Sequence, residues 1–240
     1  MEFKEFSEKL INNGNKINVD INDGQAKKYY NFMNLLIEWN EKINLTAITD
    51  PDEIIIKHFI DSITIEKYIE KNNRIIDVGT GAGFPGIPLS ILRDDLDITL
   101  MDSLNKRIKF LDEVRELNHL NNISTIHGRA EELGKNKNFR EKYDIATSRA
   151  VAPLNVLLEY MLPFVKVGGY CICMKGSNVE DEIANSKTAL SKLKGKIEKI
   201  ETFKLPDTEY GRNIIIIKKI ENTPSKYPRK PGTPAKEPLV

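Results

Sequence analysis

Residues 74–86 read Arg74-Ile-Ile-Asp77-Val-Gly79-Thr-Gly81-Ala-Gly83-Phe-Pro-Gly86. A short apolar run ends at Asp77, and three glycines then alternate at positions 79, 81 and 83. Glycine adopts backbone conformations that other residues avoid, and it lets the chain approach a ligand closely. A strand that leads into such a turn and then into a helix is a common way to hold a nucleotide-derived cofactor in α/β proteins. The stretch therefore predicts a cofactor site.

Two kinds of cofactor fit this loop. The spacing Gly81-x-Gly83-x-x-Gly86 satisfies the dinucleotide pattern, but Asp77 ahead of the glycines and prolines 85 and 88 at the helix start depart from it. Asp102 ends the next predicted strand, 25 positions after Asp77. A carboxylate there can accept the two hydroxyls of a ribose, which nicotinamide cofactors and S-adenosylmethionine both contain. It could instead cap the following helix, and the two roles are compatible.

Strand and helix patterns alternate from residue 74 onward. Candidate strands cover residues 74–78, 97–101, 124–127, 143–148 and 169–175, and candidate helices cover 85–92, 103–120, 153–164 and 179–193. This alternation predicts βαβ units and a mostly parallel sheet. Two further strands, 197–203 and 213–220, have no helix between them and predict an antiparallel hairpin at the edge of the sheet. Seven strands result.

The segments outside this α/β region have a different character. Residues 24–42 carry apolar side chains at helical spacing after a possible cap at Asn22 or Asp23, and a second helix is expected over 53–71. We therefore expect a helical N-terminal extension at 1–72, an α/β core at 73–220 and a basic, proline-rich tail at 221–240. The tail is either solvated or folded against the catalytic face.

Composition excludes several classes of protein. The net charge of +1 gives no overall attraction to nucleic acid, although six lysines and arginines face two glutamates between residues 218 and 237. No apolar run is long enough to span a membrane, and the first residues lack the apolar run of a secretory signal, so we expect a cytoplasmic protein. The two cysteines, Cys171 and Cys173, fit neither a zinc nor a redox motif and are expected in the core. No metal site is predicted.

Polar residues follow two more predicted strands. The carboxyl ends of parallel strands form one ligand crevice, so Asp77, Asp102 and Arg149 should point to the same rim. Arg149 could bind a cofactor carboxylate or an RNA phosphate, or form an ion pair with Asp77 or Asp102. Glu131, after the third strand, could meet an adenine amino group or simply favour a helix N-terminus.

At these residues the chain resembles a known family, the bacterial small-subunit rRNA (guanine-N7) methyltransferases, also called glucose-inhibited division protein B. The matching pieces follow one another in the expected order: Asn44-Leu-Thr-Ala47; His58 with Asp61-Ser62; Asp77 to Leu89; Asp102-Ser103-Leu104 with Lys106-Arg107; Arg129-Ala-Glu-Glu132; Ser148-Arg149-Ala150; Lys175-Gly176; and Tyr227-Pro-Arg-Lys230 with Gly232.

The resemblance implies a Rossmann-like class I methyltransferase that binds S-adenosylmethionine and methylates N7 of one guanine in 16S ribosomal RNA, alone or in a small-subunit particle. Carried over residue by residue, it implies cofactor contacts at Gly79, Gly81, Phe84, Asp102, Ser103, Leu104, Ala130, Glu131 and Arg149. It also implies RNA contacts at Lys106, Arg149, Arg229 and Lys230, with Arg149 acting by positioning. We expect a monomer.

The implied chemistry needs no general base. N7 of guanine has a lone pair at neutral pH, so it can attack the methyl group without losing a proton, and in-line positioning should supply most of the catalysis. His58 is the one arguable base, and we favour a structural or RNA-facing role for it. Three other functions stay open: a nicotinamide-dependent oxidoreductase, an RNA-binding assembly protein with a vestigial site, and a methyltransferase with another RNA target.

Overall fold

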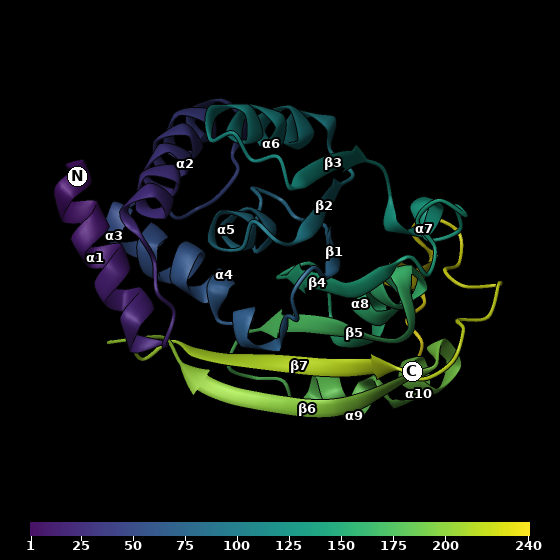
Figure 1. Cartoon of the computed structure of the whole chain (residues 1–240). Coiled ribbons are helices and arrows are strands. Elements are labelled where there is room, and N and C mark those ends of the chain that lie inside the picture. The colour runs from purple at the N-terminus through teal and green to yellow at the C-terminus, as the bar shows by residue number, and fades with distance from the viewer.

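A single seven-stranded sheet forms the centre of the molecule in the computed structural model, which describes all 240 residues (Figure 1). Its strand order is β3-β2-β1-β4-β5-β7-β6. The strands are β1 (Arg74–Val78), β2 (Asp97–Asp102), β3 (Ile123–His127), β4 (Tyr143–Arg149), β5 (Val165–Lys175), β6 (Gly195–Lys204) and β7 (Gly211–Lys219). All seven strands were predicted.

The strand directions place three predicted site residues at one rim. Strands β1 to β5 pair in parallel, so the carboxyl ends of β1, β2 and β4 lie along the same edge of the sheet. Strand β7 is antiparallel to both β5 and β6, which confirms the predicted hairpin. Strand β7 lies between β5 and β6, so β6 forms the edge of the sheet. The antiparallel strand β7 is therefore next to the edge and not at the edge.

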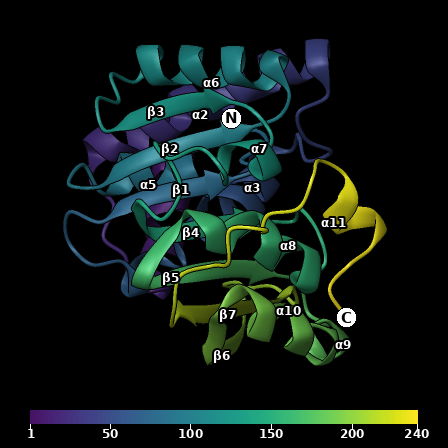
Figure 2. The same ribbon diagram turned by 90° about the vertical axis from the view of Figure 1, so that its right-hand side faces the viewer.

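Helices cover both faces of the sheet (Figures 1 and 2). One face carries α5 (Gly86–Leu92) and α6 (Asn105–Leu117), and the other carries α7 (Ala130–Leu133), α8 (Leu154–Met161), α9 (Glu180–Asn185) and α10 (Lys187–Leu193). Alternate residues of each strand serve the two faces: Ile75 joins the first core cluster and Ile76 the second. This period of two is what a sheet buried on both faces requires.

The N-terminal helices extend the first core. Helix α2 (Asp23–Ile43) packs on α5 and α6, whereas α1 (Phe3–Lys16) packs on α2 and on the helical turn at 55–60. Phe6 and Phe32 are fully buried in the same cluster as strand residues of the sheet. Asn22 caps α2, as predicted, by accepting a hydrogen bond from the Gln25 amide. No separate helix was predicted at residues 3–16, although they lie in the helical N-terminal extension that was expected at 1–72.

The expected helix at 53–71 is broken into shorter pieces. They are α3 (Pro51–Ile54), the π-helical turn η1 (Ile55–Ile60), α4 (Asp61–Ile63) and the 3-10 turn η2 (Glu66–Tyr68). The wide π turn directs the carbonyls of Lys57 and His58 towards Arg149 of β4. Single π turns inside helices are frequently found at functional sites. The expected helix at 179–193 is likewise divided, at the buried Ser186.

The C-terminal tail folds back onto the protein. Figure 2 shows it running across α8 to the short helix α11 (Thr233–Lys236). Arg140 donates to the carbonyls of Thr223 and Tyr227 at 2.6 and 2.8 Å, and the Tyr227 side chain is buried in the second core cluster. The tail is thus an ordered part of the fold.

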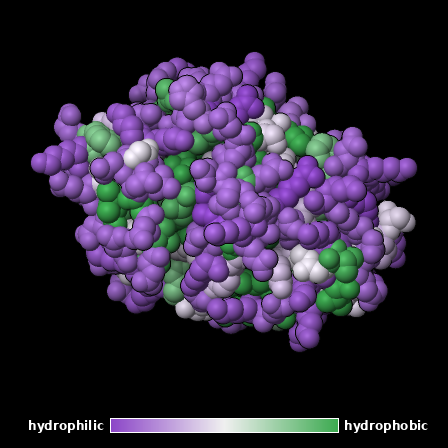
Figure 3. All heavy atoms as spheres, viewed as in Figure 1, coloured by the Kyte–Doolittle hydropathy of each residue, from purple (hydrophilic) through white to green (hydrophobic).

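The face of the molecule seen in Figure 3 is mostly hydrophilic, with hydrophobic side chains visible in separate patches. None of the helices combines the length and the apolar character needed to cross a membrane.

Candidate active site

The glycine loop between β1 and α5 has the backbone conformation that its sequence predicts. Gly79, Gly81 and Gly83 have φ values of +70°, +61° and +93°, in the left-handed region that favours glycine. A Cβ on Gly79 would lie 2.8 Å from a methyl group of Val151. The amide of Gly79 donates to the Met101 carbonyl at 2.9 Å, which fixes the loop against the end of β2.

Asp102 ends β2 and is 2% exposed. Its Oδ1 accepts from the Leu104 amide at 2.9 Å, and its Oδ2 accepts from the Gly81 amide at 3.0 Å and from Arg107 at 3.2 Å. An ionised carboxylate offers about four acceptor positions. Three are occupied in Asp102, one of them by Arg107, whose side chain is one-third exposed, and the fourth is available. Asp102 therefore organises the loop and can still accept a ligand hydroxyl. It does not cap the first amides of α6.

Asp77 supports the loop from below. Its Oδ2 accepts from the Thr80 hydroxyl at 2.7 Å and from the Gly86 amide at 2.9 Å. Its Oδ1 is buried without a hydrogen-bond partner. Burial raises the pKa of Asp77 to about 6.

A cleft of about 500 Å³ opens over the glycine loop, and we call it the glycine-loop cleft. Eight of the nine predicted cofactor residues line it: Gly79, Gly81, Phe84, Asp102, Ser103, Ala130, Glu131 and Arg149. The ninth, Leu104, supplies its amide to Asp102, but its side chain is 42% exposed and lies outside the cleft. Tyr160 of α8 also lines the cleft, and nothing in the sequence marks it among the other apolar residues of that helix.

Glu131 connects this cleft to the C-terminal tail. Its Oε1 accepts from the Gly232 amide at 2.9 Å, so one carboxylate oxygen already binds the tail. The residue lies in the first turn of the short helix α7 and is 7% exposed. Its predicted position beside an adenine is compatible with this contact, because the second oxygen can accept another donor.

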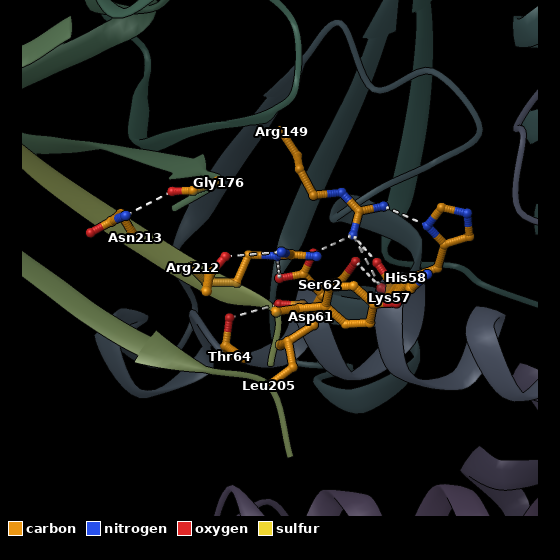
Figure 4. Close-up of polar contacts among 12 residues, drawn as sticks. Lys57, His58, Asp61, Ser62, Thr64, Arg149, Gly176, Leu205, Arg212 and Asn213 are labelled. Carbon is orange, nitrogen blue, oxygen red and sulfur yellow. Dashed lines mark hydrogen bonds and ion pairs between the residues drawn. The ribbon is translucent and has the colours of Figure 1, made fainter. Parts of the chain in front are cut away.

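Arg149 lies at the centre of the rim (Figure 4). Its guanidinium donates to the Lys57 carbonyl at 3.0 Å, to Asp61 at 3.2 Å and to Nδ1 of His58 at 3.1 Å. It also lies over the Phe84 ring, with 4.8 Å between the guanidinium carbon and the ring centroid. The ion-pair partner of Arg149 is thus Asp61, and not Asp77 or Asp102, because the π turn brings Asp61 next to the end of β4.

His58 is a neutral ring in this arrangement. It stacks on Phe84 with 4.4 Å between ring centroids, and its Nε2 lies 2.9 Å from the Thr46 hydroxyl. Burial, together with the neighbouring Arg149, lowers the pKa of His58 to about 3. A group with that pKa is a poor proton acceptor at neutral pH.

A second cleft of about 630 Å³ adjoins the first, and we call it the arginine cleft. It shares His58, Arg149, Ala150 and Val151 with the glycine-loop cleft. Its charged lining residues are Lys57, Asp61, Arg149, Lys175, Glu182 and Arg212, and the neutral His58 lies beside them. Sequence reasoning did not identify it as a cleft, because its residues come from segments far apart in the chain.

Opposite charges are paired throughout the arginine cleft. Asp61 is 3% exposed and accepts from Arg212 at 3.1 Å as well as from Arg149 (Figure 4). Lys175 donates to Glu182 at 2.7 Å and to the Ala152 carbonyl at 2.6 Å. Four cationic side chains and two carboxylates line the cleft, so it is a net cationic surface.

Comparison with known proteins places the chain in a family. Residues 25–213 match the model described as rRNA small subunit methyltransferase G. The ribosomal RNA small subunit methyltransferase G of Acetivibrio thermocellus is 56% identical over 232 residues, covering 96% of both chains. The protein of the same name from Clostridium botulinum is 50% identical, covering 98% of this chain and 99% of the relative. This chain belongs to the rRNA small subunit methyltransferase G family.

Solved structures agree with the fold. M. jannaschii TYW2 in complex with AdoMet superposes with a TM-score of 0.52 at 18% identity, covering 67% of this chain and 77% of that one. A SAM-dependent methyltransferase from Aquifex aeolicus gives 0.52 at 15% identity, covering 70% and 93%. The predicted Rossmann-like class I methyltransferase fold is confirmed, and the enzyme is an rRNA methyltransferase with S-adenosylmethionine as its cofactor.

The four residues predicted to contact RNA in this methyltransferase do not gather at one place. Lys106 is exposed on α6, and its ammonium group lies 3.5 Å from the Ile43 carbonyl. Arg149 is at the rim. Arg229 lies in the tail, where its guanidinium donates to Glu159 of α8 at 2.7 and 2.9 Å, and the Glu159 side chain is 1% exposed. Lys230 next to it is exposed.

Proposed function

We propose that this enzyme transfers the methyl group of S-adenosylmethionine to N7 of one guanine in 16S ribosomal RNA without a general base. The observation that carries the proposal is that every carboxylate and the one imidazole lining the two clefts is already held by hydrogen bonds or ion pairs within the protein. Asp102 and Glu131 bind backbone amides, Asp61 binds two arginines, and Glu182 binds Lys175. His58 is neutral and bonded at both nitrogens. N7 is a nucleophile that needs none of them as a base.

The glycine-loop cleft would bind the cofactor. Asp102 would accept from the ribose, Glu131 would accept from the adenine amino group, and the glycine loop would approach the methionine part closely. The bound cofactor supplies an electrophilic methyl group on a positively charged sulfur. Phe84 and Arg149, which line the same cleft, would shape the wall at that end.

The arginine cleft would receive the nucleotide. Lys57, Lys175 and Arg212 would bind its phosphates, with an affinity that falls as salt rises. Arg149 would act as a positioning residue, because its contacts fix His58 and Phe84 at the junction of the two clefts. The guanine would reach this junction unstacked, as enzymes that modify bases require.

We further propose different roles for the two cations of the tail. Arg229 anchors the tail through Glu159, whereas Lys230 and Lys106, which are exposed, contact the RNA backbone. The predicted division at residues 72 and 220 would then separate a helical extension and a tail from the catalytic core, although both pack on that core.

The test is a map of N7-methylguanine in 16S ribosomal RNA from cells with and without this gene. The proposal predicts one site that is lost in the deletion strain and restored by the wild-type gene but not by the Asp102→Ala variant. An unchanged map would overturn the substrate, and loss of a methyl group from another RNA would favour a methyltransferase with a different target.

A further inference from the structure

Thr46 contacts His58, one of the residues that the two clefts share, through its hydroxyl group. It follows α2 and lines the glycine-loop cleft, as do Leu45 and His58. Its Oγ1 accepts a hydrogen bond from the Ile48 amide at 3.0 Å. The same oxygen lies 2.9 Å from Nε2 of His58.

The direction of the bond to His58 follows from Arg149. A guanidinium has donors only, so Nδ1 of His58, at 3.1 Å from Nη2, must be the unprotonated nitrogen that accepts. The neutral ring then carries its proton on Nε2. Nε2 therefore donates to the Thr46 hydroxyl, and the Arg149–His58–Thr46 chain has one direction.

The proton of the Thr46 hydroxyl consequently has to point to a third atom. Both lone pairs of Oγ1 are occupied, by the Ile48 amide and by His58 Nε2–H. No hydrogen bond from this hydroxyl group to another protein atom is found in the structure, and Thr46 lines the cleft. Thr46 is thus fixed as a hydrogen-bond donor, and the chain that ends at a guanidinium strengthens it.

We propose that Thr46 donates its hydroxyl proton to O6 of the target guanine and thereby selects guanine against adenine. The inference rests on the proposed N7 methylation. N7 must keep its lone pair for the methyl group, so O6 is the other acceptor on that edge of the base. Adenine presents an amino donor at the same place, which would meet the Thr46 donor proton.

A double-substitution cycle, with one change in the protein and one in the RNA, tests this proposal. One change replaces Thr46 by Val, which keeps the shape and removes the hydroxyl group. The other replaces the mapped guanosine in 16S ribosomal RNA by 2-aminopurine riboside, which keeps N7 and lacks O6. We expect Thr46→Val to lower kcat/KM on the guanosine RNA about tenfold to a hundredfold and to leave kcat/KM on the 2-aminopurine RNA within about twofold.

Three controls separate the outcomes. Thr46→Ser retains the hydroxyl group and should restore most of the activity on guanosine RNA. The affinity for S-adenosylmethionine, measured by calorimetry, should be the same in Thr46→Val and in the wild-type enzyme, which also reports that the variant is folded. Failure of the wild-type enzyme to form N7-methylguanine would refute the proposed function itself.

Two results would overturn the role of Thr46 while leaving N7 methylation intact. An equal loss of kcat/KM on both RNAs in Thr46→Val would indicate that the residue supports the local structure and does not read O6. A weaker cofactor affinity that accounts for the whole loss would assign the hydroxyl to S-adenosylmethionine.

Discussion

The two clefts at the rim of the sheet are built from different materials. The glycine-loop cleft is built around the glycine loop and two buried carboxylates that bind backbone amides, Asp102 and Glu131, from segments that follow strands of the sheet. The arginine cleft carries four cationic side chains that only two carboxylates partly neutralise, and these charged residues come from five segments spread between residues 57 and 212. The first arrangement is fixed before a ligand arrives, which suits a single small cofactor. In the second, an RNA bound as we propose would compete with Asp61 and Glu182 for the cations.

Breaking the ion pairs of the arginine cleft should have the largest effect on stability. Asp61→Ala leaves Arg149 and Arg212 without their shared buried partner, and we expect the free energy of unfolding to fall by about 3 to 4 kcal/mol. Urea denaturation measures this change. Asp52→Ala, which removes an exposed pair with Lys9, is the control and should change it by less than about 1 kcal/mol. Similar losses in both variants would show that the buried network is not special.

Removing the carboxylate of the glycine-loop cleft should affect the cofactor. Asp102→Ala removes the predicted ribose acceptor and releases the Gly81 and Leu104 amides, so we expect S-adenosylmethionine affinity to fall about a hundredfold. Calorimetric titration is the measurement, and Lys106→Ala on the nearby exposed surface is the matched control. A change of less than about threefold in Asp102→Ala would remove Asp102 from the cofactor site.

The raised pKa of Asp77 should make the free energy of unfolding depend on pH. Its pKa is raised to about 6 in the folded protein from a usual value of 3.8, so the folded state binds this proton more tightly than the unfolded chain. The free energy of unfolding should therefore lose about 2 to 3 kcal/mol from this residue as pH rises from about 4 through 6.

Comparison with Asp77→Asn isolates that contribution. The difference between the two unfolding free energies, measured by urea denaturation at several pH values, should change over this range and level off above it. A difference that is independent of pH would mean that Asp77 titrates normally, and the orphaned oxygen beneath the glycine loop would then have to be solvated.

Substitutions of the two tail cations, Arg229 and Lys230, should have the smallest effects, one on stability and the other on RNA binding. Arg229→Ala leaves the buried Glu159 unpaired, and we expect a loss of about 1 to 2 kcal/mol in unfolding free energy. Lys230→Ala should leave stability within about 0.5 kcal/mol but reduce RNA affinity and its salt dependence. Denaturation and filter-binding assays at two salt concentrations distinguish them. An unchanged stability in Arg229→Ala would return that residue to the RNA-contacting set.

The glycine-loop cleft could be predicted from the sequence because it is local. Gly79, Asp102, Glu131 and Arg149 follow strands that the alternation of strand and helix patterns predicts, and parallel pairing brings these four residues to one rim. Leu104 is the exception, because its backbone and its side chain have different roles.

The arginine cleft could not be predicted in the same way. Asp61 lies in a segment whose pattern indicates a plain helix, and only the folded chain brings Arg149 and Arg212 onto its carboxylate. Sequence pattern also gives no sign that Glu159, buried on α8, binds Arg229. Charge counted along the chain therefore overestimates the cations available to RNA.

The most direct test of methyl transfer without a base is a pH profile of the chemical step. Formation of N7-methylguanine in 16S ribosomal RNA is followed under single-turnover conditions, with cofactor and enzyme saturating, between about pH 6 and 8.5. The account predicts a rate constant that varies by less than about twofold across this range, because His58 is neutral throughout and N7 has no proton to lose. A rate constant that falls about tenfold per pH unit below pH 7 in the wild-type enzyme, and not in His58→Asn, would contradict it.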